Sequence, residues 1–148
     1  MIKNACILLT NSSGRILCVQ LNNGLWTIPG GNIDGGETPW VAAQREFREE
    51  TGNILPDLRR ERKVFTTYDY HGHTRIYIGN TSTPDLIFNL RNTNGETRDL
   101  AYISPEDIFY GRIPFVGYSL NSLKKIYNKQ GGGKKIKLYK FLELNFKI

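Results

Sequence analysis

The sequence has little cysteine and no long apolar run. Cys6 and Cys18 are the two cysteines among 148 residues, and they have neither CxxC spacing nor a nearby histidine cluster. A disulfide scaffold or a cysteine-ligated metal centre is therefore not expected, and we expect ordinary buried thiols. No stretch approaches the ~20 apolar residues of a membrane-spanning helix, and the first apolar run is too short for a signal peptide. We expect a cytoplasmic, reducing location and no membrane association.

Acidic residues are outnumbered by basic ones, although the excess of positive charge is local. The chain contains 20 lysines and arginines against 14 aspartates and glutamates, a net charge of +6. Residues 117–148 contain eight lysines and one acidic residue, Glu143, for a net charge of +7. The other 116 residues contain 12 basic and 13 acidic residues, a net charge of −1. If the positive charge attracts a polyanionic partner such as RNA, that attraction is therefore expected to lie at the C-terminal segment.

Length and apolar content indicate a single domain. A chain of 16.9 kDa with 39% hydrophobic residues can bury a core without support from a metal or a disulfide. We predict one domain over residues 1–148, in which 131–148 form a lysine-rich extension. Short β-rich runs combined with two amphipathic helical segments indicate the α+β class.

The local signals predict two helices and several short strands. Thr38 is suited to an N-cap and Gly52 to a helix stop, which predicts a helix over 39–51. A second helix is predicted over 119–129, where apolar residues recur at helical spacing. The other predicted elements are a glycine-rich loop at 30–36 and strands at 5–9, 15–21, 25–28, 63–70, 75–79, 86–90 and 100–103.

The end of the chain alternates apolar and polar residues after three consecutive glycines. This period of two over 135–147 predicts a half-buried strand or a pair of short strands. Three interpretations of the lysine-rich segment stay open. Its lysines can form the solvated face of an edge strand, they can attract RNA or polyphosphate, or its apolar side can pair with a second subunit. The protein is accordingly expected to be a monomer or a homodimer.

Three glutamates share one face of the helix predicted over 39–51. Glu46, Glu49 and Glu50 stand at i, i+3 and i+4, a spacing at which like charges cost ~0.2–0.5 kcal/mol per pair. Glu49 and Glu50 also lie in the last turn, where the helix dipole opposes an anion by ~0.3–1 kcal/mol. A hard divalent cation with oxygen ligands, Mg²⁺ or Mn²⁺, relieves such repulsion. Arg45 precedes Glu49 by four residues and can orient its carboxylate.

The glycine-rich loop is expected to contribute to the same site. A backbone carbonyl of Gly30 or Gly31 can complete an oxygen shell around the cation. The glycine spacing over 31–38 resembles a phosphate-binding loop, but Glu37 stands where such a loop has its lysine. Because a carboxylate repels a bare triphosphate, phosphate is expected to approach through the metal.

These residues resemble the Nudix box, G-x5-E-x7-R-E-U-x-E-E-x-G-U, in which U is a bulky aliphatic residue. Every glycine and charged position of the box is matched over residues 31–53. The matching residues are Gly31, Glu37, Arg45, Glu46, Glu49, Glu50 and Gly52. Phe47 stands at the first U and Asn53 at the last, with Ile54 next to it. The preceding segment, W-T-I-P-G-G over 26–31, also resembles this family.

The resemblance implies a Nudix α/β/α sandwich, with a mixed sheet between the box helix and the C-terminal helix. It also implies metal-dependent hydrolysis of a pyrophosphate bond in a nucleoside diphosphate linked to another moiety. The implied ligands of Mg²⁺ or Mn²⁺ are Gly30, Glu46, Glu49, Glu50 and, as the additional loop glutamate that many members use, Glu96. Arg45 and Glu37 would orient these ligands, and Glu46 is the first choice of base for the attacking water.

Candidate substrate-binding residues follow the box on two predicted strands. Tyr68 and Tyr70 lie where dinucleoside polyphosphate hydrolases of the family resemble one another in having a base-stacking tyrosine, although strand tyrosines are more often core residues. Arg75 and Tyr77 share a strand face and can hold a phosphate and a base. The leading prediction is a dinucleoside polyphosphate or a (deoxy)nucleoside triphosphate as substrate. The alternatives are an RNA 5′ end or cap, and a nucleotide sensor that does not hydrolyse its ligand.

Overall fold

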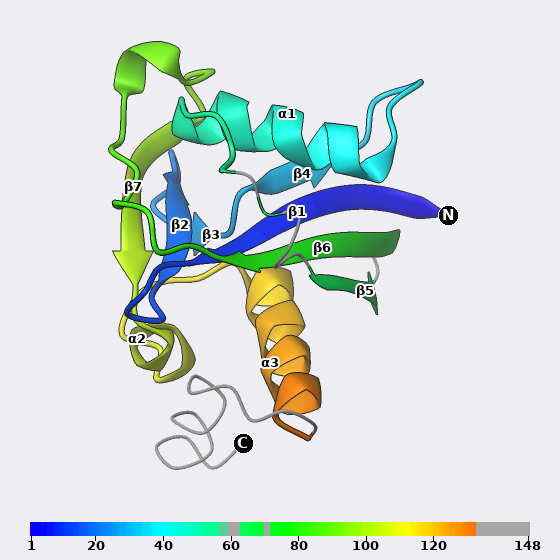
Figure 1. The fold of residues 1–148 in the computed structure, drawn as a ribbon, viewed down its shortest axis with the longest axis vertical. Coiled ribbons are helices and arrows are strands. Elements are labelled where there is room, and N and C mark those ends of the chain that lie inside the picture. Colours follow the sequence, from blue (N-terminus) through cyan, green and yellow to red (C-terminus); the bar gives the residue numbers. More distant parts are fainter. Residues whose placement is uncertain (57, 59–62, 70–71, 133–148) are drawn as a thin grey trace.

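The computed structural model describes residues 1–56, 58, 63–69 and 72–132, in which seven strands form one mixed sheet (Figure 1). The strands are β1 (Ile2–Thr10), β2 (Ile16–Leu21), β3 (Trp26–Thr27), β4 (Gly30–Asn32), β5 (Lys63–Asp69), β6 (Gly72–Asn80) and β7 (Thr97–Ile103). The helices are α1 (Pro39–Thr51), α2 (Pro105–Phe109), α3 (Gly117–Gly132) and a short 3₁₀ turn, η1 (Leu90–Asn92). The strand predicted over 135–147 and the substrate candidate Tyr70 lie outside the described residues.

Strand β1 lies at the centre of the sheet. In the order β3-β2-β1-β6-β5, it pairs with β6 in parallel and with β2 antiparallel. It also pairs antiparallel with β4, and β2 pairs antiparallel with β7. Successive residues of a strand point to opposite faces of the sheet. The alternate side chains of β1 therefore enter two separate cores.

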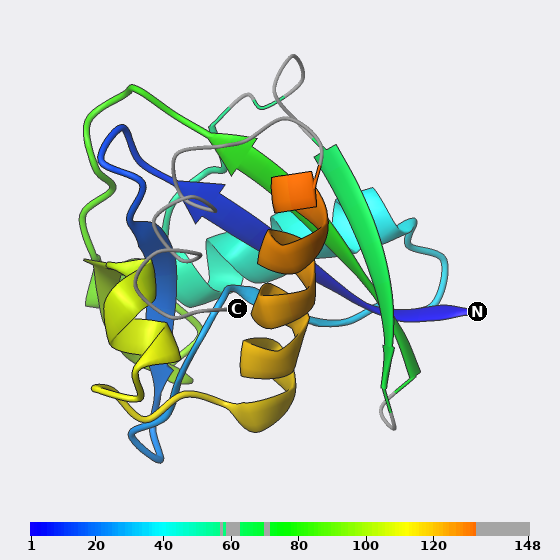
Figure 2. The same ribbon diagram turned by 90° about the horizontal axis from the view of Figure 1, so that it is seen from below.

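A helix covers each face of the sheet, which confirms the predicted α/β/α sandwich (Figures 1 and 2). On one face Ile7 and Leu9 pack with Phe47 of α1, and all three side chains are fully buried. On the other face Leu8 packs with Tyr127 of α3. Burying a side chain of this size contributes ~1.5–3 kcal/mol. The helix that carries the glutamates is thus held firmly against the sheet.

Helix α1 begins and ends where its sequence predicts. The Thr38 hydroxyl accepts a hydrogen bond from the Val41 N–H at 3.2 Å, as an N-cap does. Gly52 ends the helix with φ 71°, and its N–H donates to the Arg48 carbonyl. A Cβ at Gly52 would also lie 2.8 Å from the carbonyl oxygen of Asn89. Glycine is therefore required both by the left-handed backbone and by this contact.

Two segments differ from their predicted structure. Residues 30–32 form strand β4 instead of part of a loop, because they pair with Asn4, Ala5 and Cys6 of β1. The prediction of a strand over 86–90 is wrong, because this segment runs irregularly past the end of α1 into η1. There the Asn53 side chain donates to the Ile87 carbonyl at 3.0 Å, which takes the place of strand pairing.

Helix α2 is not among the predicted elements. Its five residues are too few for a helical hydrophobic period. The signals that it does carry are Ser104, whose hydroxyl accepts from the Asp107 N–H at 3.3 Å, and Pro105 in the first turn. Among the described residues, no helix combines the length and apolarity needed to cross a membrane.

Candidate active site

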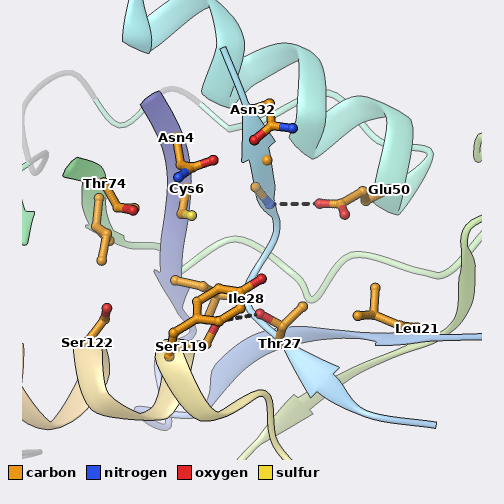
Figure 3. Close-up of a pocket in the computed structure, with 14 residues that line it drawn as sticks. Asn4, Cys6, Leu21, Thr27, Ile28, Asn32, Glu50, Thr74, Ser119 and Ser122 are labelled. Carbon is orange, nitrogen blue, oxygen red and sulfur yellow. Dashed lines mark hydrogen bonds between the residues drawn. The ribbon is translucent and has the colours of Figure 1, made fainter. Parts of the chain in front are cut away.

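The glycines of β4 allow α1 to approach the sheet closely. A Cβ on Gly30 would lie 2.6 Å from the Ala5 carbonyl oxygen, and a Cβ on Gly31 would lie 2.7 Å from the carboxyl carbon of Glu46. Side chains at these two positions would displace their neighbours. In the space that glycine leaves, the Gly30 N–H donates to Oε1 of Glu50 at 2.7 Å (Figure 3). The candidate metal ligands of α1 therefore meet β4 directly.

Arg45 is the centre of a network of acidic side chains. Its Nε and Nη2 donate to the two oxygens of Glu37 at 2.6 and 3.0 Å, which is a bidentate pair. Its Nη1 donates to Glu46 and to Glu49, at 3.0 Å in each case. The hydrogen bonds to Glu37 raise the pKa of Arg45, and Arg45 lowers the pKa of the Glu37 carboxyl group. A single guanidinium thus orients three of the predicted site carboxylates.

Glu50 is the most buried of these carboxylates, with 6% of its surface exposed. Burial raises the pKa of Glu50 to about 8, although the hydrogen bond from Gly30 acts in the opposite direction. Negative charge on the neighbouring glutamates raises this pKa further. Burial also raises the pKa of Glu46, against the lowering effect of Arg45. At neutral pH Glu50 is therefore mostly protonated unless a further positive charge binds beside it.

The predicted loop glutamate lies near the cluster. Negative charge on Glu96 contributes to the raised pKa of both Glu46 and Glu50. Its loop is attached to the end of α1, because the Asn94 N–H donates to the Glu49 carbonyl at 2.8 Å. The tertiary structure therefore brings Glu96, 46 residues beyond Glu50 in the sequence, to the same end of the helix.

The donor set fits a hard divalent cation by its chemistry. The candidate ligands are carboxylate oxygens of α1 and of the Glu96 loop, together with the Gly30 carbonyl, and such oxygens are the ligands that Mg²⁺ prefers. Among the described residues, no three acidic, histidine or cysteine side chains converge on one metal-binding point. Arg45 instead holds one oxygen of Glu46 and one of Glu49. Arg45 offsets only part of the negative charge of the cluster, and the remaining negative charge favours an additional cation.

A cavity of about 320 Å³ lies beside Glu50, between the sheet and α3. Gly30, Gly31 and Glu50 line it at the carboxylate cluster, and Ser119 and Ser122 line it on α3. Figure 3 shows Glu50 reaching toward the cavity from α1 while the two serines reach toward it from the opposite helix. The cavity is therefore continuous with the carboxylate cluster.

The lining of this cavity combines polar and apolar side chains and has little charge. Among the described residues that line it, Glu50 is the only acidic or basic one. Thr27 and Ser119 form a hydroxyl–hydroxyl hydrogen bond of 2.7 Å, and further polar groups come from Asn4, Asn32, Thr74 and Ser122. None of these residues is among the predicted site residues. The sequence has one signal for them in α3, where Ser119 and Ser122 lie among apolar residues at helical spacing, and in the structure both serines are buried.

Tyr77 lies on the other face of the sheet. On β6, Thr74 and Ile76 line the cavity. The side chain of Tyr77 is only 5% exposed and packs against Trp40 of α1, with ring centroids 4.8 Å apart. Arg75, two residues before Tyr77, shares its face because strand side chains alternate. These two residues are together, as the sequence predicts, but on the side away from the cavity.

Tyr68 of β5 also lies away from the cavity. It pairs in register with His73 of β6, and the two ring centroids are 4.7 Å apart. The Tyr68 side chain is 65% exposed. The structure therefore does not bring Tyr68, Arg75 or Tyr77 to the cavity, and their role in substrate binding stays a prediction.

Comparison with known proteins identifies the family of this chain. The sequence profile of the NUDIX domain matches residues 2–121. The chain belongs to the Nudix family. It is 29% identical over 113 residues to the putative 8-oxo-dGTP diphosphatase of Bacillus subtilis. The aligned region covers 76% of this chain and 69% of that protein. It is 39% identical over 69 residues to the RNA pyrophosphohydrolase of Gluconobacter oxydans, and here the aligned region covers 45% of this chain and 41% of that protein.

The likeness to solved structures extends further along this Nudix chain. An Ap4A hydrolase from C. elegans superposes with a TM-score of 0.63 at 20% identity, over 88% of this chain and 99% of that one. At this identity the likeness shows the Nudix fold. The chain spans 32 to 41% of the length of the first curated relatives that it matches.

Proposed function

We propose that this Nudix protein is a pyrophosphohydrolase that uses Mg²⁺ or Mn²⁺ to cleave a pyrophosphate bond in a nucleoside diphosphate linked to another moiety. The observation that carries the proposal is the position of Glu50. Its carboxylate belongs to the acidic cluster of α1 and also lines the cavity under α3, whose other described lining residues are neither acidic nor basic. A ligand that enters this cavity therefore has one end at the predicted metal site and the other among hydroxyl and amide groups.

Different residues of the cluster are proposed to bind the cation, orient its ligands and accept the proton. Glu46, Glu49 and Glu50, with the Gly30 carbonyl and Glu96, would hold the cation. The cation would neutralise charge on the phosphoryl oxygens and lower the pKa of the attacking water. Arg45, through its hydrogen bonds to Glu37, Glu46 and Glu49, keeps the ligands oriented. Glu46 is the proposed proton acceptor, because burial raises its pKa and its side chain is more exposed than that of Glu50, so a water can reach it more readily.

The cavity is proposed to hold the nucleoside part of the substrate. Its volume of about 320 Å³ is at the lower end of the range for small-ligand sites. Its lining has no cationic side chain among the described residues, which suits a neutral base and sugar better than a phosphate. A (deoxy)nucleoside triphosphate or a dinucleoside polyphosphate is the proposed substrate. The names of the Bacillus subtilis relative and of the C. elegans structure agree with these two classes.

A second candidate is the 5′ end of RNA. Two observations favour it: the net charge of +7 over residues 117–148, and a relative named RNA pyrophosphohydrolase. In this case the first nucleoside would occupy the same cavity, and the lysines would attract the chain that follows. Such attraction would weaken steeply with increasing salt.

A substrate panel with product identification tests the proposal. The panel contains dGTP, 8-oxo-dGTP, Ap4A, 5′-triphosphate RNA and capped RNA, each with Mg²⁺ or Mn²⁺. We expect hydrolysis of at least one member, and we expect Glu49→Gln and Glu50→Gln each to lower turnover by about a hundredfold or more. Glu106→Gln is the matched control, because Glu106 lies on α2 and pairs with Arg112.

Two outcomes would contradict the proposal. Full activity in Glu49→Gln or Glu50→Gln would overturn the assignment of that glutamate as a metal ligand. Measurable nucleotide binding without hydrolysis across the whole panel would overturn the enzymatic activity and indicate a nucleotide sensor. The clustered glutamates argue against a sensor, because they repel one another and serve no evident purpose without a cation.

A further inference from the structure

The loop that carries Glu96 is attached to the box helix by its backbone. The Asn94 N–H donates to the Glu49 carbonyl at 2.8 Å. This carbonyl belongs to the last turn of α1, where carbonyls have no partner within the helix. The loop therefore completes the hydrogen bonding of the helix at the residue whose own side chain is a candidate metal ligand.

The Asn94 side chain continues this attachment to Glu96. Its Oδ1 accepts from the Glu96 N–H at 3.0 Å, which closes an Asx turn. Its Nδ2 donates to Oε2 of Glu96 at 3.1 Å. Asparagine provides both an acceptor and a donor, so it can hold the backbone and the carboxylate of the same glutamate. Glycine follows at position 95 with φ 84°, a backbone conformation that L side chains rarely adopt.

A second asparagine also supports the loop. The Asn22 Nδ2, in the turn between β2 and β3, donates to the Gly95 carbonyl at 3.1 Å. Downstream, Thr97 begins β7 and is 2% exposed. The backbone around Glu96 is therefore held by the side chains of Asn22 and Asn94 on one side and by the start of β7 on the other. The side chain of Glu96 itself is exposed to solvent.

We propose that Asn94 is a positioning residue that holds the Glu96 carboxylate beside the glutamates of α1 for cation binding. The relevance of this role to hydrolysis rests on the proposed function. The proposal itself predicts only how strongly the protein binds a divalent cation. Without the Asn94 side chain, Glu96 can still reach the cluster, but the carboxylate has to be ordered when the cation binds. Loss of such supporting hydrogen bonds typically weakens metal affinity by about 10- to 100-fold.

The test measures Mn²⁺ binding to the full chain by electron paramagnetic resonance, without substrate. Asn94→Ala keeps the backbone hydrogen bond to Glu49 and removes only the side-chain contacts. We expect this variant to bind Mn²⁺ about tenfold more weakly than the parent. Asn94→Ser can still accept from the Glu96 N–H as Ser/Thr turns do, so its affinity should lie between those of the parent and the alanine variant.

A double-mutant cycle separates positioning from a general structural effect. If Asn94 acts through Glu96, then Asn94→Ala should change affinity less than about twofold in a Glu96→Gln background. An equal loss of affinity in both backgrounds would overturn the proposal, and so would an unchanged affinity in the single variant. If the parent binds Mn²⁺ but hydrolyses no nucleotide, the proposed function fails and the positioning role is still decided by the cycle.

The turn between β2 and β3 offers a matched pair of controls. Asn22→Ala removes the contact to Gly95 and should weaken Mn²⁺ binding by a smaller factor than Asn94→Ala. Asn23→Ala removes a hydrogen bond within the turn itself, from the Leu25 N–H to the Asn23 side chain. The Asn23 variant should bind Mn²⁺ as the parent does. Weaker binding in Asn23→Ala than in Asn22→Ala would contradict the proposed support.

Discussion

Replacement of Glu50 by glutamine should remove much of the pH dependence of stability in the metal-free protein. Burial raises the pKa of Glu50 to about 8 in the folded chain, whereas an unfolded glutamate titrates near ~4.3. Between these pH values the folded protein keeps a proton that the unfolded chain has released. The contribution to stability is thus complete below the unfolded pKa and is lost as the pH rises toward 8.

The size of the effect follows from the pKa difference. Each pH unit between the two pKa values changes the free energy of unfolding by about 1.4 kcal/mol. Between pH 5 and pH 8, the free energy of unfolding of the parent should fall by about 3 to 4 kcal/mol more than that of Glu50→Gln. For a chain of this length that corresponds to a difference in melting temperature on the order of 10 °C. Glutamine keeps the carbonyl oxygen that accepts from Gly30, so the variant tests ionisation and not the hydrogen bond.

The assay is urea unfolding followed by tryptophan fluorescence at pH 5 and pH 8, with a chelator present. Glu106→Gln controls for the loss of a carboxylate elsewhere. Added Mg²⁺ should reduce the difference at pH 8, because binding requires the ionised carboxylate and stabilises the folded parent. Equal losses of stability in the parent and in Glu50→Gln between pH 5 and pH 8 would refute the reasoning.

Two further predictions concern β4 and the cavity. Gly31→Ala places a Cβ against the movable carboxylate of Glu46, so it should lower activity by about tenfold with little loss of stability. Gly30→Ala meets the backbone of β1 instead and should cost about 1–3 kcal/mol in a denaturant titration; the reverse order of stabilities would contradict this packing. Ser122→Leu should raise the KM for nucleotide and leave Mn²⁺ affinity unchanged. Asn121→Leu, at the exposed neighbouring position, should change neither quantity. Equal KM values in the two variants would exclude the cavity as the nucleoside site.

The elements that the sequence predicted correctly are those whose signals are local. Thr38 and Gly52 mark the ends of α1 because capping depends on residues within one turn. The contacts of Arg45 with Glu46 and Glu49 follow from positions on the same helix. Apolar periodicity predicted α3, although the helix is longer than the pattern, over Gly117–Gly132.

The elements that the sequence did not predict depend on contacts between distant segments. Gly30 and its neighbours look like a loop because glycine has low strand propensity, and only pairing with β1 makes them a strand. The segment over 86–90 has the composition of a strand, but it meets the end of α1 through Asn53 and pairs with no strand in the described part of the chain. Local propensity carries no information about either partner.

By itself the sequence determined the identity of the acidic cluster, since the spacing of Arg45, Glu46, Glu49 and Glu50 along one helix, with Glu37 just before it, is a local property. The tertiary structure decided which groups surround it. It placed Glu96 at the end of α1 through Asn94, and it put the serines of α3, instead of Tyr77, across the cavity from Glu50. Strand residues one position apart point to opposite faces. Which face meets a site and which meets a core is decided only when the helices pack onto the sheet.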